Sequence, residues 1–459
     1  MYVQRKKSLA TVSDNTNLKS PYGNLVGEDK RDLYEILKYH EPSFLMEFND
    51  YIVIGTSPKR IFQAKKDETI VLDLDGRESK FPKRDFFKIV DEYLKEKRPC
   101  PNNYAPFDGG LLGYIGYDII SDSCSSSPFP DAFLFEPGVY CVADKTTGKI
   151  ISSNQRAFFD ELHFETAFEA HGYEDVPFKL ESIPSKEDFI SMVSEVLERI
   201  KKGEATQVVL SRQIKSKDVF CPLSLYKTLK TVNPSPYMFI MNFDGKSLIG
   251  SSPELLLGIK NGVAVTRPIA GTRRRGKDLD EDNFFEMEML FDDKEREEHM
   301  LLLELSMEEF RGICLNESIK VSKYFEVERY SKVMHLVSQV EGKLRPDISA
   351  IRALQASFPA GTVTGTPKEV AIKIIGEAEP FSRGPYGGAI GYVGFNGNLE
   401  MSIAIRTFMQ TDEGLTIQAG AGIVPGSDPK REFLETQNKA AGLIETLKIA
   451  KTRRGDSNA

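Results

Sequence analysis

The chain has 459 residues, of which 40% are hydrophobic and 28% are charged, and its formal net charge is −8. This composition is ordinary for a soluble globular protein with a large core and two domains, and the negative charge argues against a general nucleic-acid-binding protein. No apolar run approaches the ~18 residues that a membrane helix needs. The N-terminus also lacks the apolar segment of a secretory signal. We therefore expect a cytoplasmic protein that binds neither nucleic acid nor membrane.

The cysteines are scattered, odd in number and without a CxxC pair, which is typical of reduced thiols in the cytoplasm. None of the five has the glycine-flanked surroundings and partner histidine of a nucleophilic cysteine. The cysteines are Cys100, Cys124, Cys141, Cys221 and Cys314.

The chain order predicts an N-terminal domain of short strands followed by a larger mixed domain. Residues 1–28 are polar and predict little order, and residues 29–182 contain strand-like runs such as "FLMEF", "YIVIG" and "GVYCVAD". A boundary is expected near Pro184, followed by an amphipathic helix, "KEDFISMVSEVLERIKKG", that Gly203 ends.

Residues 183–450 mix strands such as "TQVVLSRQI" with one helix from Asn283 to about Phe310 and a last helix from Pro429. Residues 451–459 form a polar tail. Because glycine turns separate the strands, we expect antiparallel sheets covered by helices, an α+β arrangement.

The segment "VTRPIAGTRRRG", residues 265–276, reads as a strand and a tight turn followed by Arg273, Arg274 and Arg275. Its backbone donors and guanidinium groups suit an anionic ligand. Two glycine-rich segments, 383–392 and 418–424, could also present backbone N–H groups to an anion. A tight bend in a sheet explains those glycines equally well.

Two helices each place carboxylates within a few residues of one another. Together they could hold a hard cation such as Mg²⁺, which prefers oxygen ligands. The alternative is a pair of solvated helix faces, which the spacing alone favours. The side chains are Glu295, Glu298 and His299 on the first helix and Glu432, Glu435 and Lys439 on the last.

A set of motifs from about Glu187 to Leu447 resembles the chorismate-utilising enzymes, and among them component I of anthranilate synthases. Each motif alone is weak, whereas the ordered set is specific. The resemblance implies a layered sandwich of antiparallel sheets, with a catalytic chorismate-binding domain at 183–450 and a regulatory, partner-contacting domain at 29–182. The motifs are "QVVLSR", "NPSPYMF", "GSSPELL", "PIAGTR", "EREEHMLL", "VMHLVSQVEG", "FPAGTVTGTPK", "GPYGGAIGY", "IAIRT", "QAGAGIV" and "EFLETQNKA".

Two residues distinguish the chemistries of this family. Aminodeoxychorismate synthases typically carry a nucleophilic lysine where this chain has Ala270. Relatives that add water to chorismate typically carry a lysine as general base where this chain has Gln207. The resemblance therefore implies ammonia as the nucleophile, without a covalent lysine intermediate.

The resemblance also implies roles for individual residues. Glu254 and His335 match the pair that protonates the departing 4-hydroxyl, and Lys439 places a positive charge near a magnesium site that binds the ring carboxylate. Magnesium would be held, directly or through water, by Glu295, Glu298, Glu432 and Glu435. The remaining substrate contacts are Tyr386 and Arg406 at the enolpyruvyl carboxylate, the backbone of Gly420 and Gly422, and Thr272, Thr362 and Ala270 around the ring.

Two departures from the family pattern stand out. Met307, Glu308 and Glu309 replace an Arg-Asn-Asp triplet, for which the sequence indicates no role. Phe48 stands where the "LLES" element of the tryptophan feedback site has its serine, and the following "RYS" element is absent. We therefore expect weak or no inhibition by tryptophan.

The activity implied is the conversion of chorismate and ammonia to anthranilate and pyruvate through aminodeoxyisochorismate, the first committed step of tryptophan biosynthesis. A separate glutamine amidotransferase subunit, component II, would deliver the ammonia in a hetero-oligomer. The alternatives are an enzyme that releases the amino intermediate to another pathway, an aminodeoxychorismate synthase component I, and an inactive regulatory paralogue.

Overall fold

The computed structural model describes residues 31–32, 41–97, 105–120, 127–155, 162–163, 179–330 and 333–456. The prediction for residues 1–28 lies outside these ranges. The last helix, α11 (Pro429–Asp456), continues into the segment predicted as a polar tail. Within the described ranges, no helix is both long and apolar enough to cross a bilayer.

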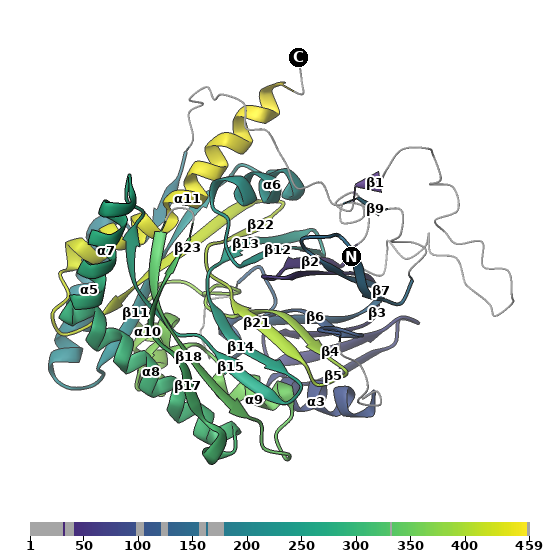
Figure 1. The fold of residues 1–459 in the computed structure, drawn as a ribbon. Helices are drawn as coiled ribbons and strands as arrows, with labels where there is room; N and C mark the ends of the chain where they lie inside the picture. Colours follow the sequence, from purple (N-terminus) through teal and green to yellow (C-terminus); the bar gives the residue numbers. More distant parts are fainter. Residues whose placement is uncertain are drawn as a thin grey trace, which may run out of the picture.

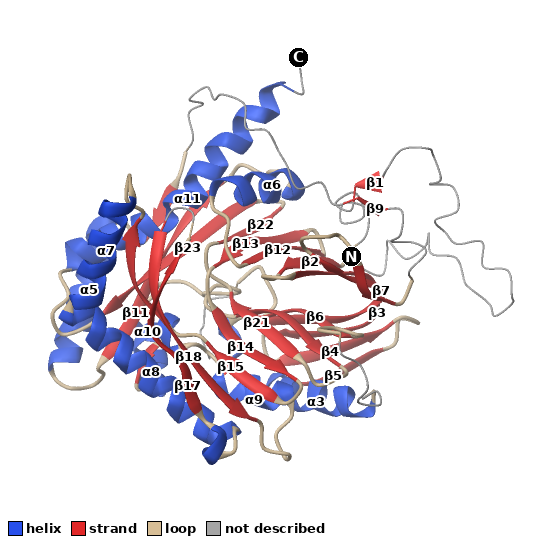
Figure 2. Ribbon diagram, in the orientation of Figure 1, coloured by secondary structure: helices blue, strands red, loops and turns tan. Residues whose placement is uncertain are grey.

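Apart from a short parallel pair, β1 (Arg31–Asp32) with β9 (Leu162–His163), the described strands form two antiparallel layers that share one hydrogen-bonded network (Figure 2). The first layer runs, in spatial order, through β10 (Glu181–Ile183), β11 (Gln207–Ser216), β23 (Gly414–Ile423), β22 (Thr407–Thr411), β13 (Lys246–Ser252), β12 (Tyr237–Phe243) and β2 (Ser43–Glu47). The second runs through β6 (Gly110–Ile115), β20 (Ala389–Gly394), β21 (Leu399–Ile403), β14 (Leu255–Lys260), β15 (Val263–Thr266) and β18 (Val333–Lys343), and β18 also pairs with β16 (Ile269–Arg274) and β17 (Lys320–Arg329).

Two long strands, β3 (Tyr51–Lys65) and β7 (Ala132–Asp144), join the layers. The first half of β3 pairs with β2, and its second half pairs with β4 (Glu68–Asp73), which pairs in turn with β5 (Glu78–Pro82). The register between β3 and β7 shifts at Pro58, beside Ser57 with a φ of 56°. A Cβ on Gly138 would lie 2.3 Å from the Ser57 carbonyl oxygen, so the crossing requires glycine there.

The space between the layers is filled by large side chains from both. Phe44, Phe239 and Phe243 come from the first layer, and Tyr114 and Ile390 come from the second. All five are buried, as expected for strands that alternate inward and outward residues. The predicted α+β sandwich is confirmed.

Helices cover the outer faces of both layers (Figure 1). They pack through separate apolar clusters, so the molecule has one core between the layers and others beneath the helices. The first layer is covered by α6 (Pro222–Val232) and α11, strand β11 by α5 (Lys186–Lys201) and α10 (Lys368–Ala378), and the second layer by α3 (Phe86–Glu96) and α9 (Ala350–Ser357).

The helix predicted from Asn283 to about Phe310 is wrong in one respect, because two helices occupy it. Helix α7 covers Leu279–Phe291 and α8 covers Asp293–Ile313, and Asp292 between them caps both helices. Asp292 has an extended backbone, and its carboxylate accepts a hydrogen bond from the Glu295 N–H. Aspartate is a preferred residue at the N-terminal cap of a helix, because its carboxylate accepts a hydrogen bond from a backbone N–H that has no partner within the helix. Because α8 begins after this break, Glu295 and Glu298 lie in its first two turns.

The division predicted at residue 182 stays a prediction. Strands from both sides of it pair directly, β2 with β12 and β6 with β20. The smaller N-terminal part therefore completes both layers of the sandwich.

Candidate functional site

Five of the predicted site residues meet where β23 faces α11. The guanidinium of Arg406 donates to the Lys439 carbonyl, and the Lys439 ammonium donates to the Gly420 carbonyl at 3.0 Å. Lys439 also pairs with Glu435 at 2.6 Å, one helical turn away. The hydroxyl of Tyr386 lies 2.8 Å from the position that a Cβ on Gly420 would take. The side chains of Arg406, Lys439 and Tyr386 thus lie close to the backbone of Gly420.

Arg406 adopts a φ of 53°, which is uncommon for a residue other than glycine. Such a conformation costs on the order of 1–3 kcal/mol and persists where surrounding contacts fix it. Burial lowers the pKa of Arg406, although the side chains of Tyr386 and Glu435 act in the opposite direction. The guanidinium remains a cation because an arginine pKa starts so high.

Residues 418–423 are regular strand within β23, so the bend considered for these glycines is absent there. Gly420 and Gly422 pair with Ser211 and Val209 of β11. The glycines are needed for a different reason, because a Cβ on Gly422 would lie 2.7 Å from the amide nitrogen of Gln207. Because glycine has no side chain, the Tyr386 hydroxyl and the Gln207 amide can lie close to the strand backbone at these two positions.

Glu254 is a buried carboxyl between β13 and β14, with 7% of its surface exposed. Burial raises its pKa to about 7, against the smaller effects of the Thr362 hydroxyl and the Lys439 charge. Within the described chain, the Thr362 hydroxyl has no hydrogen bond of standard geometry. Glu254 is therefore partly protonated near neutral pH, as a general acid requires.

His335 lies on β18, opposite Thr272 of the neighbouring strand β16. Its ring Nδ1 donates to the Gly271 carbonyl at 3.2 Å, since a carbonyl oxygen can only accept. Burial lowers the pKa of His335, and the nearby charge of Arg406 lowers it further. His335 is therefore neutral near pH 7, which leaves Glu254 as the stronger proton donor. Ala270 is buried one position from Gly271.

Gln207, the first residue of β11, is 2% exposed and faces helix α8. Its amide nitrogen donates to the Glu298 carboxylate at 3.4 Å. Its amide oxygen is buried without a hydrogen-bond partner among the described residues. This hydrogen bond connects Gln207, which distinguishes the chemistries of the family, with Glu298, a predicted magnesium ligand.

The four predicted magnesium ligands differ in their surroundings. Glu295 accepts from Arg273 at 3.0 Å, Glu435 pairs with Lys439, and Glu432 is only 5% exposed in the first turn of α11. The described residues contain no group of three or more carboxylate, imidazole or thiol side chains close enough to hold a metal together. The oxygen donors suit Mg²⁺ chemically, but two of the four are neutralised by basic neighbours.

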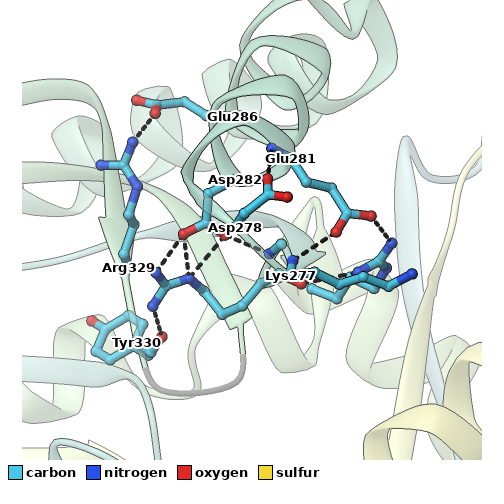
Figure 3. Close-up of polar contacts among 10 residues, drawn as sticks. Lys277, Asp278, Glu281, Asp282, Glu286, Arg329 and Tyr330 are labelled. Atoms are coloured by element: carbon cyan, nitrogen blue, oxygen red, sulfur yellow. Dashed lines mark hydrogen bonds and ion pairs between the residues drawn. The ribbon is translucent and has the colours of Figure 1, made fainter.

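The three arginines at residues 273–275 contact carboxylates of the chain itself. Arg275 donates to Asp282 and to the Tyr330 carbonyl, and Arg274 donates to Glu281. Figure 3 shows these contacts gathered around the start of α7. The first turn of α7 is acidic, and acidic groups at a helix N-terminus attract cations from adjacent strands. Arg273 similarly pairs with Glu295 and with Asp292. The run fixes α7 and α8 over strand β16.

The sequence reasoning missed a fully buried ion pair beneath the site. Arg383 pairs with Glu379 at 2.7 Å and donates to the carbonyls of Val209 and Val363. Glu379 in turn accepts from the backbone of Ser211. This pair joins β11 to the loop that carries Thr362. The sequence feature that could have indicated this ion pair is Arg383 in "RGPYGG", a segment that we interpreted from its glycines alone.

His299 lies one helical turn from Glu295 on α8, as the spacing predicted, and is fully buried. Its Nε2 lies 2.7 Å from the Ser338 hydroxyl, and burial lowers the pKa of His299 to about 4. A neutral histidine in that position supports packing between α8 and β18.

Comparisons with known proteins agree on one family. The chorismate binding enzyme family matches residues 71–445. The anthranilate synthase component 1 of Aquifex aeolicus (strain VF5) is 35% identical, with 96% of each chain covered.

Solved structures show the same architecture. The structure of anthranilate synthase component I from Streptococcus pneumoniae TIGR4 aligns with a TM-score of 0.73 and 29% identity, covering 95% of this chain and 100% of that one. The menaquinone-specific isochorismate synthase MenF of Escherichia coli aligns with a TM-score of 0.70 and 23% identity, covering 92% of each chain. The second likeness concerns the fold alone.

Proposed function

Because the chain belongs to the family of chorismate binding enzymes, we propose that it is a lyase that converts chorismate and ammonia to anthranilate, pyruvate and water. The route would pass through aminodeoxyisochorismate, as the first committed step of tryptophan biosynthesis. The observation that carries the choice of nucleophile is the pair Gln207 and Ala270. Neither position offers a lysine that could activate water or attack the ring covalently.

The residues support an acid-assisted displacement. Glu254 gives its proton to the departing 4-hydroxyl of chorismate, which leaves as water while ammonia forms a bond to the ring, and the resulting ammonium group releases one proton to become the amine. Loss of a ring proton and cleavage of the enolpyruvyl ether then give the aromatic amine and pyruvate. Arg406 and Tyr386 would hold the carboxylate of the enolpyruvyl arm, and the backbone at Gly420 and Gly422 would orient it.

Magnesium is part of this proposal. A bound ion would neutralise the ring carboxylate of chorismate and favour the developing charge of the reaction. Glu298 and Glu432 are the better candidates for direct ligands, because Glu295 and Glu435 already face Arg273 and Lys439. The latter two would act through water or change partner when chorismate binds.

A partner subunit would supply the ammonia. The described cysteines are Cys141 and Cys314, which are buried, and Cys221, which is exposed, while Cys100 and Cys124 lie outside the described residues. None has the sequence surroundings of a glutaminase nucleophile. We propose a cytoplasmic hetero-oligomer with a glutamine amidotransferase, which residues 29–182 would help to contact.

The test is incubation of the purified chain with chorismate, magnesium and an ammonium salt, with anthranilate followed by fluorescence and pyruvate by a coupled assay. We expect both products in equal amounts, and none when glutamine replaces ammonium. An amino product without pyruvate would instead support an aminodeoxyisochorismate synthase. Chorismate left unchanged would support an inactive paralogue, and turnover of glutamine by the chain alone would refute the need for a partner.

A further inference from the structure

A small cavity adjoins Glu254 on the side of helix α8. Its volume is about 30 Å³, enough for one or two water molecules. Aliphatic side chains form part of its wall, and five residues contribute polar side chains. They are Glu254, Thr266, Ser306, Glu309 and Thr362.

Glu309 belongs to the Met307–Glu309 triplet for which the sequence indicated no role. Its carboxylate pairs with Lys368 at 2.7 Å, at the start of α10, and 17% of its side chain is exposed. Lys368 also donates to the Ser357 carbonyl. Glu309 thus lies between solvent and the cavity, whereas Glu254 is the more deeply buried carboxyl.

The cavity wall is tightly held. A Cβ on Gly361 would lie 2.4 Å from a terminal carbon of Leu305, so α8 packs directly against the loop that carries Thr362. The buried Thr362 hydroxyl, which lacks a partner of standard geometry in the described chain, lines the same cavity. A water molecule in the cavity would add a hydrogen-bond partner for this hydroxyl, which also acts on the Glu254 carboxyl.

We propose that water in this cavity connects Glu254 to Glu309, and that Glu309 returns a proton to Glu254 after each turnover. The inference rests on the proposed function, in which Glu254 gives a proton to the leaving hydroxyl once per cycle. That proton leaves in the water formed, and one proton is released when the added ammonia becomes an amine, so the buried Glu254 carboxyl must be reprotonated once per cycle. Glu309 does not touch substrate and acts only through Glu254 and the intervening water.

Both carboxyls lie in surroundings that favour their protonated forms. Burial raises the pKa of Glu254 to about 7 and also raises the pKa of Glu309. The charged groups that face them are Lys439 near Glu254 and Lys368 at Glu309, and each lowers the pKa of its neighbour. Lys368 thereby opposes the effect of burial on Glu309.

The test compares Glu309→Gln with Glu308→Gln in ammonia-dependent turnover. Glu308 is the adjacent carboxylate, is 72% exposed and pairs only with the exposed Arg311 among the described residues. We expect Glu309→Gln to lower kcat by about ten-fold or more, with KM for chorismate unchanged and a larger solvent deuterium isotope effect on kcat. Glu308→Gln should match the wild type, and Glu309→Asp should recover part of kcat. Equal kcat and pH profiles for Glu309→Gln and the wild type would overturn the relay.

Two further variants separate proton return from a structural role. If the ion pair only holds α8 against α10, Lys368→Met should reduce kcat as much as Glu309→Gln, and that result would overturn the proposal. Under the relay, Lys368→Met keeps most of kcat but shifts its pH profile. Ser306→Val, which fills the cavity, should reproduce the Glu309→Gln effect, while Ser306→Ala should not.

The proposal and the proposed function fail differently. A wild-type chain that makes no anthranilate refutes the function, whatever the variants do. A high-resolution crystal structure tests the cavity without any activity, and electron density for water bridging Glu254 and Glu309 is expected there. An empty cavity, or one closed by collapse of Ser306, would refute the relay even in an active enzyme.

Discussion

The side-chain amide of Gln207 donates to the carboxylate of Glu298 at 3.4 Å and joins the first residue of β11 to the carboxylate face of α8. A lysine in place of Gln207 would therefore meet a carboxylate, which favours its charged form and opposes a role as general base. We expect Gln207→Lys to lose most anthranilate synthesis and to form isochorismate weakly at best, as measured by product chromatography. Full anthranilate synthesis by this variant would show that Gln207 does not face the nucleophile.

Removal of one predicted metal ligand should abolish most activity while the fold survives. Glu298→Gln keeps the size of the side chain but deletes a charged oxygen donor, so the concentration of magnesium needed for half-maximal activity should rise by about ten-fold or more. Glu297→Gln is the matched control, because Glu297 is the adjacent glutamate and is exposed. Equal magnesium dependence in the two variants would exclude Glu298 as a ligand.

Activity should fall as pH rises through about 7. Burial raises the pKa of Glu254 to about 7, so its acid form is present below that pH and is lost above it. We expect kcat/KM, expressed per free ammonia, to decline above pH 7, and Glu254→Gln to remove both the decline and most of the activity. A profile that stays flat from about pH 6 to pH 8.5 would assign the acid role elsewhere.

Stability should also depend on pH through Glu400. Burial raises its pKa from 4.5 to about 7, although the Tyr51 hydroxyl donates to it and opposes the rise. The pKa of Glu400 is higher in the folded state than in the unfolded state. Glu400 therefore contributes fully to the free energy of unfolding below about pH 4.5, and this contribution is lost as pH rises through 7. Glu400→Gln should remove about 3 kcal/mol of this decline in the free energy of unfolding, as measured by urea titration at pH 5 and pH 8. The same decline in both proteins would contradict the assignment.

Local patterns predicted most single elements. Helix α5 begins at Lys186 and is followed by Gly203 with a φ of 84°, as the amphipathic spacing and the glycine indicated. The break at Asp292 was missed because the carboxylates around it suit both a helix interior and a cap, and Arg273 from a distant strand helps decide between them.

The candidate site was only partly readable from sequence. The resemblance assigned Tyr386, Arg406 and Lys439 to one site, and in the structure Arg406 contacts Lys439 while the Tyr386 hydroxyl lies beside Gly420. Burial decides how each behaves, and burial comes from long-range packing that no motif displays. The roles of Glu309 and Arg383 were missed for the same reason, since their partners Lys368 and Glu379 matter only once α10 packs on β11.

The space beside the "NPSPYM" segment is already filled by Phe48. The Phe48 ring is fully buried and stacks on Tyr51 with ring centroids 4.7 Å apart. It also meets the edges of Tyr237, within that segment, and of Tyr392. The neighbouring carboxylate of Glu47 forms ion pairs with Lys145 and Lys230, so it is already partnered within the chain.

We therefore predict that tryptophan inhibits this protein weakly or not at all. A bound amino acid needs partners for its ammonium and carboxylate groups, and loss of one charge-assisted hydrogen bond costs on the order of 1.5–3 kcal/mol, or roughly ten- to hundred-fold in affinity. Tryptophan would also have to displace a buried aromatic ring. The measurement is a tryptophan titration of ammonia-dependent turnover, with Phe48→Ser as the comparison. Half-inhibition at low micromolar tryptophan in the wild type would contradict the prediction, whereas stronger inhibition in Phe48→Ser than in the wild type would show that this ring closes the site.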